Sequence, residues 1–280
     1  MSPRRVLITG GSKGIGRAAA EALAERGWRV ALLAREAHAL ERARSELPGE
    51  GHEVFAMDVA DEDSWENLGS RLGDVQGLVC AAAVLGPVGP IGSYAIADFR
   101  RTLEVNVVGT LLAIRACLSG LRASGGAIVT FSGGGATAPL PRFDAYAASK
   151  AAVVRLSENL SVELAGQGVR INCVAPGFVA TEIHQSTLAA GPELAGADYF
   201  EQTRAQLERG GVPVSEAAGL VCQLLEGDPE AQFTGKLISA QWDAWREPSF
   251  RRRLADERDL ATLRRIDDAL FAVTGEPASA

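Results

Sequence analysis

The sequence has little of what metal centres require. Its 280 residues include three histidines and four cysteines, and no two cysteines form a C-x-x-C pair with the spacing of metal ligands. All four cysteines stand in apolar segments, where a free thiol behaves as a small buried hydrophobic group. We therefore expect no metal ion, and reduced, buried thiols at Cys80, Cys117, Cys173 and Cys222.

A signal peptide, a membrane span and a basic surface are also lacking. The apolar run near the N-terminus covers residues 6–9 before glycines interrupt it, which is too short for a secretory signal. No run approaches the ~18 apolar residues of a membrane helix. The net charge of −7 leaves no excess of lysine and arginine to neutralise nucleic acid or an anionic membrane. We predict a cytoplasmic protein that binds neither.

What the sequence does have is an alternation of short apolar runs and longer amphipathic segments. The segments at 17–27 and 97–121 have helical spacing. Apolar strands between such helices are typical of a parallel sheet covered on both faces. The sequence therefore predicts a single-domain α/β fold with a doubly wound parallel sheet, whose strands cover 5–9, 29–34, 53–59, 77–82, 127–132 and 170–176.

A glycine-rich loop, TGGSKGIGR at 9–17, joins the first predicted strand to the first helix. Its glycines permit a tight turn and a close approach of the backbone to a pyrophosphate, which the free N–H groups of a helix N-terminus attract. A merely structural tight turn is the alternative. We expect a dinucleotide to contact Gly10, Ser12, Lys13, Gly14, Ile15 and Gly16.

The end of the second predicted strand indicates which dinucleotide binds. Ala34 occupies the position where an acidic residue would bind the adenosine ribose, Arg35 follows it, and Lys13 can approach from the loop. Basic residues there favour a 2′-phosphate, so we predict NADP(H). The alternative is that Arg35 is a solvated loop residue. Asp58 and Val59, which end the third strand, are expected to flank the adenine.

A tyrosine and a lysine stand four residues apart in DAYAASK at 144–150. On a helix, side chains with this spacing share one face. A fixed cation beside a phenol lowers its pKa from the usual ~10, so Tyr146 and Lys150 predict a tuned acid/base. The alternative is a packed tyrosine beside a surface lysine.

Five motifs, taken in order, resemble the short-chain dehydrogenase/reductase family over about residues 4–240. The motifs are TGGSKGIG, Asn106 in NVVG, a serine at the end of the fifth predicted strand, YAASK, and PGFVAT at 176–181. The resemblance implies a Rossmann fold and hydride transfer between NAD(P)(H) and a carbonyl or alcohol. It also implies a homodimer or homotetramer, formed through the helices around 98–121 and 146–165.

The resemblance assigns a role to each matching residue. Tyr146 would be the general acid/base, and Lys150 the cation that lowers its pKa and holds the nicotinamide ribose. Ser132 would polarise the substrate oxygen, and Asn106 would anchor a water in a proton relay. Beyond the glycine loop, the expected cofactor contacts are Arg35, Asp58, Val59, Ala82, Tyr146, Lys150, Pro176, Gly177, Val179 and Thr181.

The chain departs from the family pattern inside the expected site. CAAA at 80–83 replaces the usual stretch that carries an amide side chain. The serine is out of register, because the family's spacing would place it at Gly133 and not at Ser132. We expect Ser132 to keep the role through a loop adjustment. The alternative is a structural serine, with the substrate oxygen held by Tyr146 alone or by a backbone donor.

A third departure lies at the C-terminus. Trp242, Asp243, Trp245 and Arg246 could stack on a polyhydroxylated substrate and bind its hydroxyls, or the tryptophans could pack the extension onto the body or a partner subunit. We expect a catalytic body at 1–245 with a substrate lid at about 181–211, and an extension at 246–280.

The combined prediction is an NADP(H)-dependent oxidoreductase acting on a ketone or secondary alcohol, with a sugar-like or cyclitol-like compound as one candidate substrate. An epimerase or dehydratase that uses bound cofactor transiently is one alternative. A non-catalytic dinucleotide-sensing protein is the other, since fold alone does not fix function.

Overall fold

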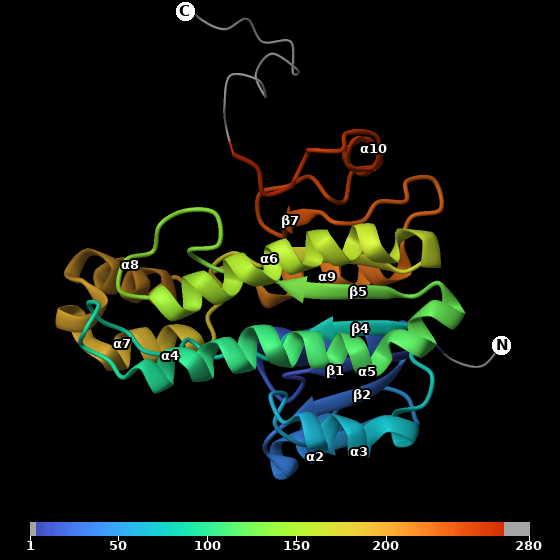
Figure 1. Ribbon diagram of the computed structural model, residues 1–280, viewed down its shortest axis with the longest axis horizontal. Coiled ribbons are helices and arrows are strands. Elements are labelled where there is room, and N and C mark those ends of the chain that lie inside the picture. The colour runs from blue at the N-terminus through green and yellow to red at the C-terminus, as the bar shows by residue number, and fades with distance from the viewer. Residues whose placement is uncertain (1–3, 266–280) are drawn as a thin grey trace, which may run out of the picture.

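A parallel sheet of seven strands, in the order β3-β2-β1-β4-β5-β6-β7, forms the centre of the molecule. The computed structural model describes residues 4–265 (Figure 1), so part of the expected extension at 246–280 lies outside the described residues. The strands are β1 Arg5–Thr9, β2 Arg29–Ala34, β3 Glu53–Ala56, β4 Gly77–Cys80, β5 Ala127–Phe131, β6 Arg170–Ala175 and β7 Leu237–Ser239.

The predicted doubly wound α/β fold is confirmed. Strands β4 and β5 are buried along their whole length, which explains why their sequences are apolar on both faces. Strand β3 ends at Ala56, earlier than expected, because the chain turns after it toward Asp58. Strand β7 was not predicted, since three residues next to polar neighbours give too short a pattern.

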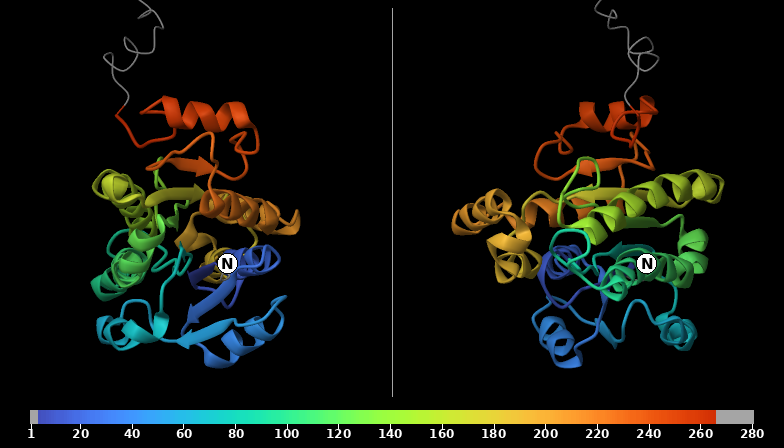
Figure 2. Two further views of the ribbon diagram at one scale, coloured as in Figure 1. Left: turned by 90° about the vertical axis from the view of Figure 1, so that its right-hand side faces the viewer. Right: turned by 60° about the vertical axis from the view of Figure 1, so that its left-hand side comes forward.

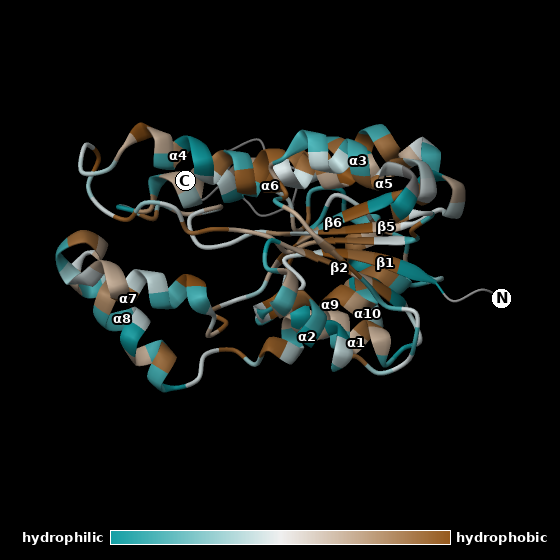
Figure 3. Ribbon diagram, turned by 90° about the horizontal axis from the view of Figure 1, so that it is seen from below, coloured by the Kyte–Doolittle hydropathy of each residue, from teal (hydrophilic) through white to brown (hydrophobic). Residues whose placement is uncertain are grey.

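Helices cover both faces of the sheet, as Figure 3 shows. Helices α1, α2 and α9 pack on one face and α3, α5 and α6 on the other, with a separate apolar core under each layer. The helices are α1 Gly14–Ala24, α2 Ala37–Ser45, α3 Glu62–Leu72, α4 Ile96–Leu103, α5 Gly109–Ser124, α6 Asp144–Leu164, α7 Glu182–Ala195, α8 Ala197–Glu208, α9 Val214–Glu226 and α10 Pro248–Asp256.

Helices α4 and α5 form one long helix, interrupted by a π-helical turn, η1, at Glu104–Val108. Within the described residues, this span of Ile96–Ser124 is the helix that is long and apolar enough to cross a membrane by length and composition. Half of its most apolar window is buried inside the fold, as expected for a core helix that faces a sheet.

The lid expected at 181–211 consists mainly of α7 and α8, which pack against each other. Helix α7 is broken at Gly191, where φ is 78°, just before Pro192. In Figure 1 the pair lies beyond the ends toward which the β4 and β5 arrows point. These are the carboxyl ends of the strands, where open α/β sheets bind ligands.

The C-terminal chain returns to the sheet edge formed by β7. Figure 2 shows α10 beyond that edge, and the Leu237 N–H donates to the Ala261 carbonyl at 2.7 Å. Trp245 is 6% exposed in the core beneath α9, and its indole N–H donates to the Ala240 carbonyl. Trp245 therefore packs the extension onto the body, whereas Trp242 is 80% exposed.

Candidate active site

The first turns of α6 hold the tyrosine and lysine at the carboxyl end of β5. Lys150 is 5% exposed, and its ammonium donates to the Phe131 carbonyl at 3.1 Å. The same nitrogen lies 5.6 Å from the centre of the Tyr146 ring. The two side chains therefore share one helix face, and this lysine is not a surface residue.

Burial controls the titration of both groups. It lowers the pKa of Lys150 to about 8, because a buried ammonium loses its hydration. Burial also raises the pKa of Tyr146, with a smaller contribution from the nearby Tyr199 phenol. The sequence predicts the opposite direction, a pKa lowered by the Lys150 charge, and loss of hydration is the largest cause of the shift in this structure. Tyr146 is therefore protonated at neutral pH, as a proton donor must be.

Asn106 lies in the π-helical turn and is 1% exposed. Its amide nitrogen donates to the Val84 carbonyl and to the Ser149 hydroxyl, both at 2.9 Å, and its carbonyl oxygen accepts from the Val84 N–H at 2.8 Å. Ser149 in turn donates to the Tyr146 carbonyl at 2.7 Å. Asn106 thus ties the chain after β4 to the helix that carries Tyr146.

These bonds explain how the chain tolerates CAAA at 80–83. The Ala82 N–H donates to the Thr9 hydroxyl at 3.3 Å, and Asn106 binds both backbone groups of Val84. Sequence reasoning missed Thr9 and Ser149 as supports. Thr9 lies in the motif TGGSKGIG and Ser149 in YAASK, and these positions were the sequence signal for a supporting role.

The end of β5 places Gly133 against the phenol. A Cβ atom built on Gly133 would lie 2.5 Å from the Tyr146 hydroxyl oxygen. Ser132 is 4% exposed, and its N–H continues the sheet by donating to the Val174 carbonyl at 2.9 Å.

The glycine loop has the close backbone contacts that a dinucleotide cradle needs. A Cβ atom on Gly10, where φ is 67°, would lie 2.8 Å from the Ala82 Cα. Helix α1 begins at Gly14 with no side-chain hydrogen bond from its N-cap, Lys13. The Thr181 methyl carbon would lie 3.5 Å from a Cβ on Gly14, so the start of the lid meets the loop. These residues fit a bound dinucleotide.

The residues expected around the adenosine differ in their surroundings. Arg35 is exposed directly after β2, and it forms no ion pair or side-chain hydrogen bond with any residue in the range 4–265. Lys13 forms an ion pair with Glu182 of α7, and Asp58 forms one with Arg101 of α4. The side chain of Val59 is buried, which leaves its backbone to face a ligand.

An apolar cluster connects the lid to Tyr146, and we call it the lid cluster. The Tyr199 ring of α8 packs on Phe143 with ring centres 4.8 Å apart. Phe143 is fully buried and stands directly before α6. The members of the lid cluster are Leu85, Val88, Leu140, Phe143, Tyr146, Ile183, Ala195, Tyr199 and Phe200.

Comparison with known proteins places this geometry in a family. The chain is 33% identical over 244 residues to the uncharacterized oxidoreductase YgfF of Escherichia coli (strain K12), covering 83% of this chain and 96% of the relative. It is 37% identical over 184 residues to D-threitol dehydrogenase of Mycolicibacterium smegmatis, covering 63% and 70%. The solved structure of NAD+-bound xylitol dehydrogenase superposes with a TM-score of 0.73 at 27% identity, covering 84% and 96%.

The family assignment rests on a match to most of the chain. A family model described as short chain dehydrogenase matches residues 4–190, a range that holds the glycine loop, Asn106 and the Tyr146–Lys150 pair. The relatives include oxidoreductases named for alcohols and ketones, and the family uses nicotinamide dinucleotides. This chain therefore belongs to the short-chain dehydrogenase/reductase family of oxidoreductases.

Proposed function

We propose that this protein catalyses NADP(H)-dependent hydride transfer between a ketone and a secondary alcohol. The observation that carries the proposal is the convergence of Tyr146 and Lys150 at the end of the sheet where the glycine loop lies, with the Asn106 network bonded to the Tyr146 carbonyl through Ser149. A dinucleotide sensor would have no need of a buried phenol beside a buried ammonium.

Each residue of the proposed site has a separate role in the reduction. When bound, the dinucleotide supplies the hydride. Tyr146, whose pKa is raised by burial, gives its proton to the substrate oxygen as the carbonyl carbon is reduced. Lys150 holds the nicotinamide ribose and offsets the charge left on the phenol. The Ser149 and Asn106 bonds fix the turn of α6 that carries both groups, and we propose that Asn106 also anchors the expected water.

Replacement of Tyr146 by phenylalanine tests this role directly. We expect Tyr146→Phe to lower turnover by about 10²–10⁴-fold, the range for loss of a general acid, while NADPH still binds. The measurement is NADPH oxidation with ketones, together with fluorescence titration of the cofactor. Unchanged turnover would refute the role. Product formation without net cofactor consumption would instead favour the epimerase or dehydratase alternative.

We propose NADP(H) as the preferred cofactor because Arg35 is exposed beside the expected ribose site and has no charged partner among residues 4–265. We expect Arg35→Ala to weaken NADPH binding about tenfold, as for loss of one charge-assisted contact to a phosphate, and to leave NADH binding unchanged. Exchange of another exposed arginine, Arg209→Ala, serves as the control. Equal loss for both cofactors, or tighter binding of NADH by the native protein, would contradict the proposal.

The substrate pocket is proposed to lie between Tyr146 and the lid. The lid cluster is apolar apart from two phenol groups, which favours a ketone with an apolar portion. The names D-threitol dehydrogenase and xylitol dehydrogenase instead favour a polyhydroxylated substrate. Of the two tryptophans considered for stacking on such a substrate, Trp242 is exposed and Trp245 is buried. A panel divided between keto-sugars or keto-cyclitols and apolar ketones decides between them. A Trp242→Ala effect on KM would implicate the tail.

We also propose how the body and the extension are arranged, where the protein is located and how its subunits pair. The body at 1–245 acts with an extension that packs on it, as the Lys236 and Trp245 contacts support. A cytoplasmic location is consistent with the four buried free cysteines. Subunits are proposed to pair through the helix formed by η1 and α5, which exposes Val108 and Leu111, and through α6, which exposes Val162.

A further inference from the structure

We propose that the second hydroxyl group at the substrate oxygen comes from Tyr199 of the lid helix α8, and not from Ser132 of the sheet. The inference rests on the proposed function, because it assigns a donor for the same reduction. Two features of the site support it: the space beside the Tyr146 phenol and the packing of Tyr199.

The space beside the phenol has no room for a serine. The Tyr146 hydroxyl would be 2.5 Å from a Cβ on Gly133, and two of its ring carbons would be 3.0 Å away. A side chain at position 133 would therefore push the phenol out of its place. Gly133 lets Tyr146 rest against the backbone, and the strand end contributes no hydroxyl at the point nearest to the phenol.

Ser132 is held in the sheet next to this point. Its N–H still pairs with Val174 of β6 at 2.9 Å, and its side chain is 4% exposed. Side chains alternate along a strand, so Ser132 lies on the same face of the sheet as Thr130, whose hydroxyl meets Ser157 of α6. Ser132 is therefore the competing donor, one residue before the position that contacts the phenol.

Tyr199 reaches the same region from the lid. Tyr146 and Tyr199 belong to the lid cluster, and the Tyr199 ring is fixed by its tilted contact with Phe143, three residues before Tyr146. Burial raises the pKa of the Tyr199 phenol too, so it keeps its proton at neutral pH and can donate a hydrogen bond.

The two phenols would have different tasks. As hydride reaches the carbonyl carbon, the electron pair of the C=O bond moves to the oxygen, which takes the proton of Tyr146. Tyr199 donates a hydrogen bond to that oxygen and retains its own proton. Because Tyr199 belongs to α8, this second donor is in place only when the lid is packed on Phe143.

The test compares Tyr199→Phe with Ser132→Ala, and includes Tyr94→Phe as a matched removal of a phenol. Tyr94 donates to Asp144 at 2.8 Å and is outside the lid cluster. Tyr199→Phe keeps the ring that packs on Phe143 and removes only the hydroxyl. We expect it to lower kcat by about 10²-fold, as for loss of an oxyanion donor, with unchanged melting temperature and NADPH affinity. Ser132→Ala and Tyr94→Phe should change kcat less than threefold, a small effect by the same scale.

A pH profile distinguishes a direct role from packing. At high pH the negative charge of ionised Tyr199 helps to raise the Tyr146 pKa, so Tyr199→Phe should shift the alkaline part of the pH dependence of alcohol oxidation to lower pH. The chain has three tyrosines, so ultraviolet titration of the Tyr94→Phe background can follow the remaining two phenols.

The outcomes separate this inference from the proposed function. A large loss in Ser132→Ala, or losses of similar size in both variants, overturns the assignment to Tyr199. Native turnover in Tyr199→Phe overturns it as well. If Tyr199→Phe fails to fold, Tyr199→His, which keeps a ring and an N–H donor, should retain more turnover than Tyr199→Leu, and equal loss would overturn the inference. Turnover that survives Tyr146→Phe would refute the proposed function itself.

Discussion

At the scale of single residues, burial brings the pKa of the Lys150 ammonium close to neutral pH. Its pKa of about 8 lies below the ordinary 10.5 because the side chain is buried. The charged form is present below pH 8 and is lost as the pH rises through 8, well before an exposed lysine would lose its proton. Any interaction that needs this charge must weaken over the same interval.

We therefore expect NADPH affinity to be constant from pH 6 to about 7 and to fall above about 8, following the value for Lys150. The measurement is the dissociation constant by NADPH fluorescence between pH 6 and about 9.5. Arg35→Ala, which weakens binding without altering Lys150, should show the same pH dependence. Affinity that stays flat to about 9.5 would show that binding does not depend on the Lys150 charge.

Residue-scale prediction from the sequence succeeded where spacing along one element decides the geometry. Tyr146 and Lys150 follow from an i, i+4 pair on a helix, and their meeting required no other information. The register of the serine could not be settled, since one residue at a strand end depends on how the following loop folds. The direction of the Tyr146 pKa was also missed, because residues of the distant lid bury the phenol.

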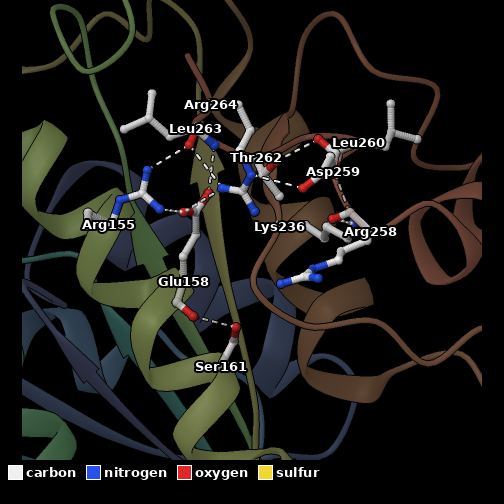
Figure 4. A network of polar contacts seen from close by, with 10 residues as sticks. All are labelled: Arg155, Glu158, Ser161, Lys236, Arg258, Asp259, Leu260, Thr262, Leu263 and Arg264. Carbon is white, nitrogen blue, oxygen red and sulfur yellow. Dashed lines mark hydrogen bonds and ion pairs between the residues drawn. The ribbon is translucent and has the colours of Figure 1, made fainter. Parts of the chain in front are cut away.

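At the scale of elements, a buried lysine is one of the residues that bind the extension to the sheet. Lys236 is 5% exposed, and its ammonium donates to the carbonyls of Glu257, Arg258 and Leu260 at 2.7–3.0 Å. Figure 4 shows a second set of bonds nearby, in which Glu158 accepts from the Leu263 N–H at 2.6 Å. The chain after α10 is thus fastened to β7 and α6 together.

We expect Lys236→Met to lower the free energy of unfolding by about 2–4 kcal/mol, since three hydrogen bonds to a charged donor are lost in a buried place. Turnover at 25 °C should change little, because the ammonium binds the extension and not the site. Urea denaturation measures the effect, and Arg252→Met, which removes an exposed cation of α10, is the control. Equal stability of the two variants would show that Lys236 does not hold the extension.

Element prediction was accurate for the inner strands and poor for the lid. The limits of β1 and β2 follow from continuous apolar runs that end at glycine or charge. Helices α7 and α8 were described only as a lid, because glycine and proline interrupt their pattern at Gly191 and Pro192. Packing between the two helices, which single-sequence periodicity does not report, stabilises them.

At the scale of the whole molecule, one helical layer carries apolar side chains on its outer surface. Val108 and Leu111, on the helix formed by η1 and α5, are 45% and 38% exposed, and Val162 on α6 is 78% exposed. Isolated exposed apolar residues are common, but these lie on neighbouring helices of the same sheet face. They lie on the helices through which the sequence predicts subunits to pair.

We expect the double variant Val108→Glu, Leu111→Glu to reduce the oligomer to a smaller species, because buried carboxylates without partners oppose association. Sedimentation velocity measures the change. Leu194→Glu, at an exposed apolar residue of the lid, is the control and should keep the native mass. A native protein that is already monomeric, or a double variant of native mass, would contradict the predicted interface.

The three lysines of the chain, Lys13, Lys150 and Lys236, also determine how the protein can be labelled chemically. Two of them are buried at 5% exposure, whereas the Lys13 side chain is 61% exposed on the glycine loop. An amine-reactive dye or resin will therefore couple at Lys13 or at the α-amino group. Because Lys13 is at the expected cofactor site, immobilisation through amines should inactivate the protein, and coupling in the presence of NADPH should protect it.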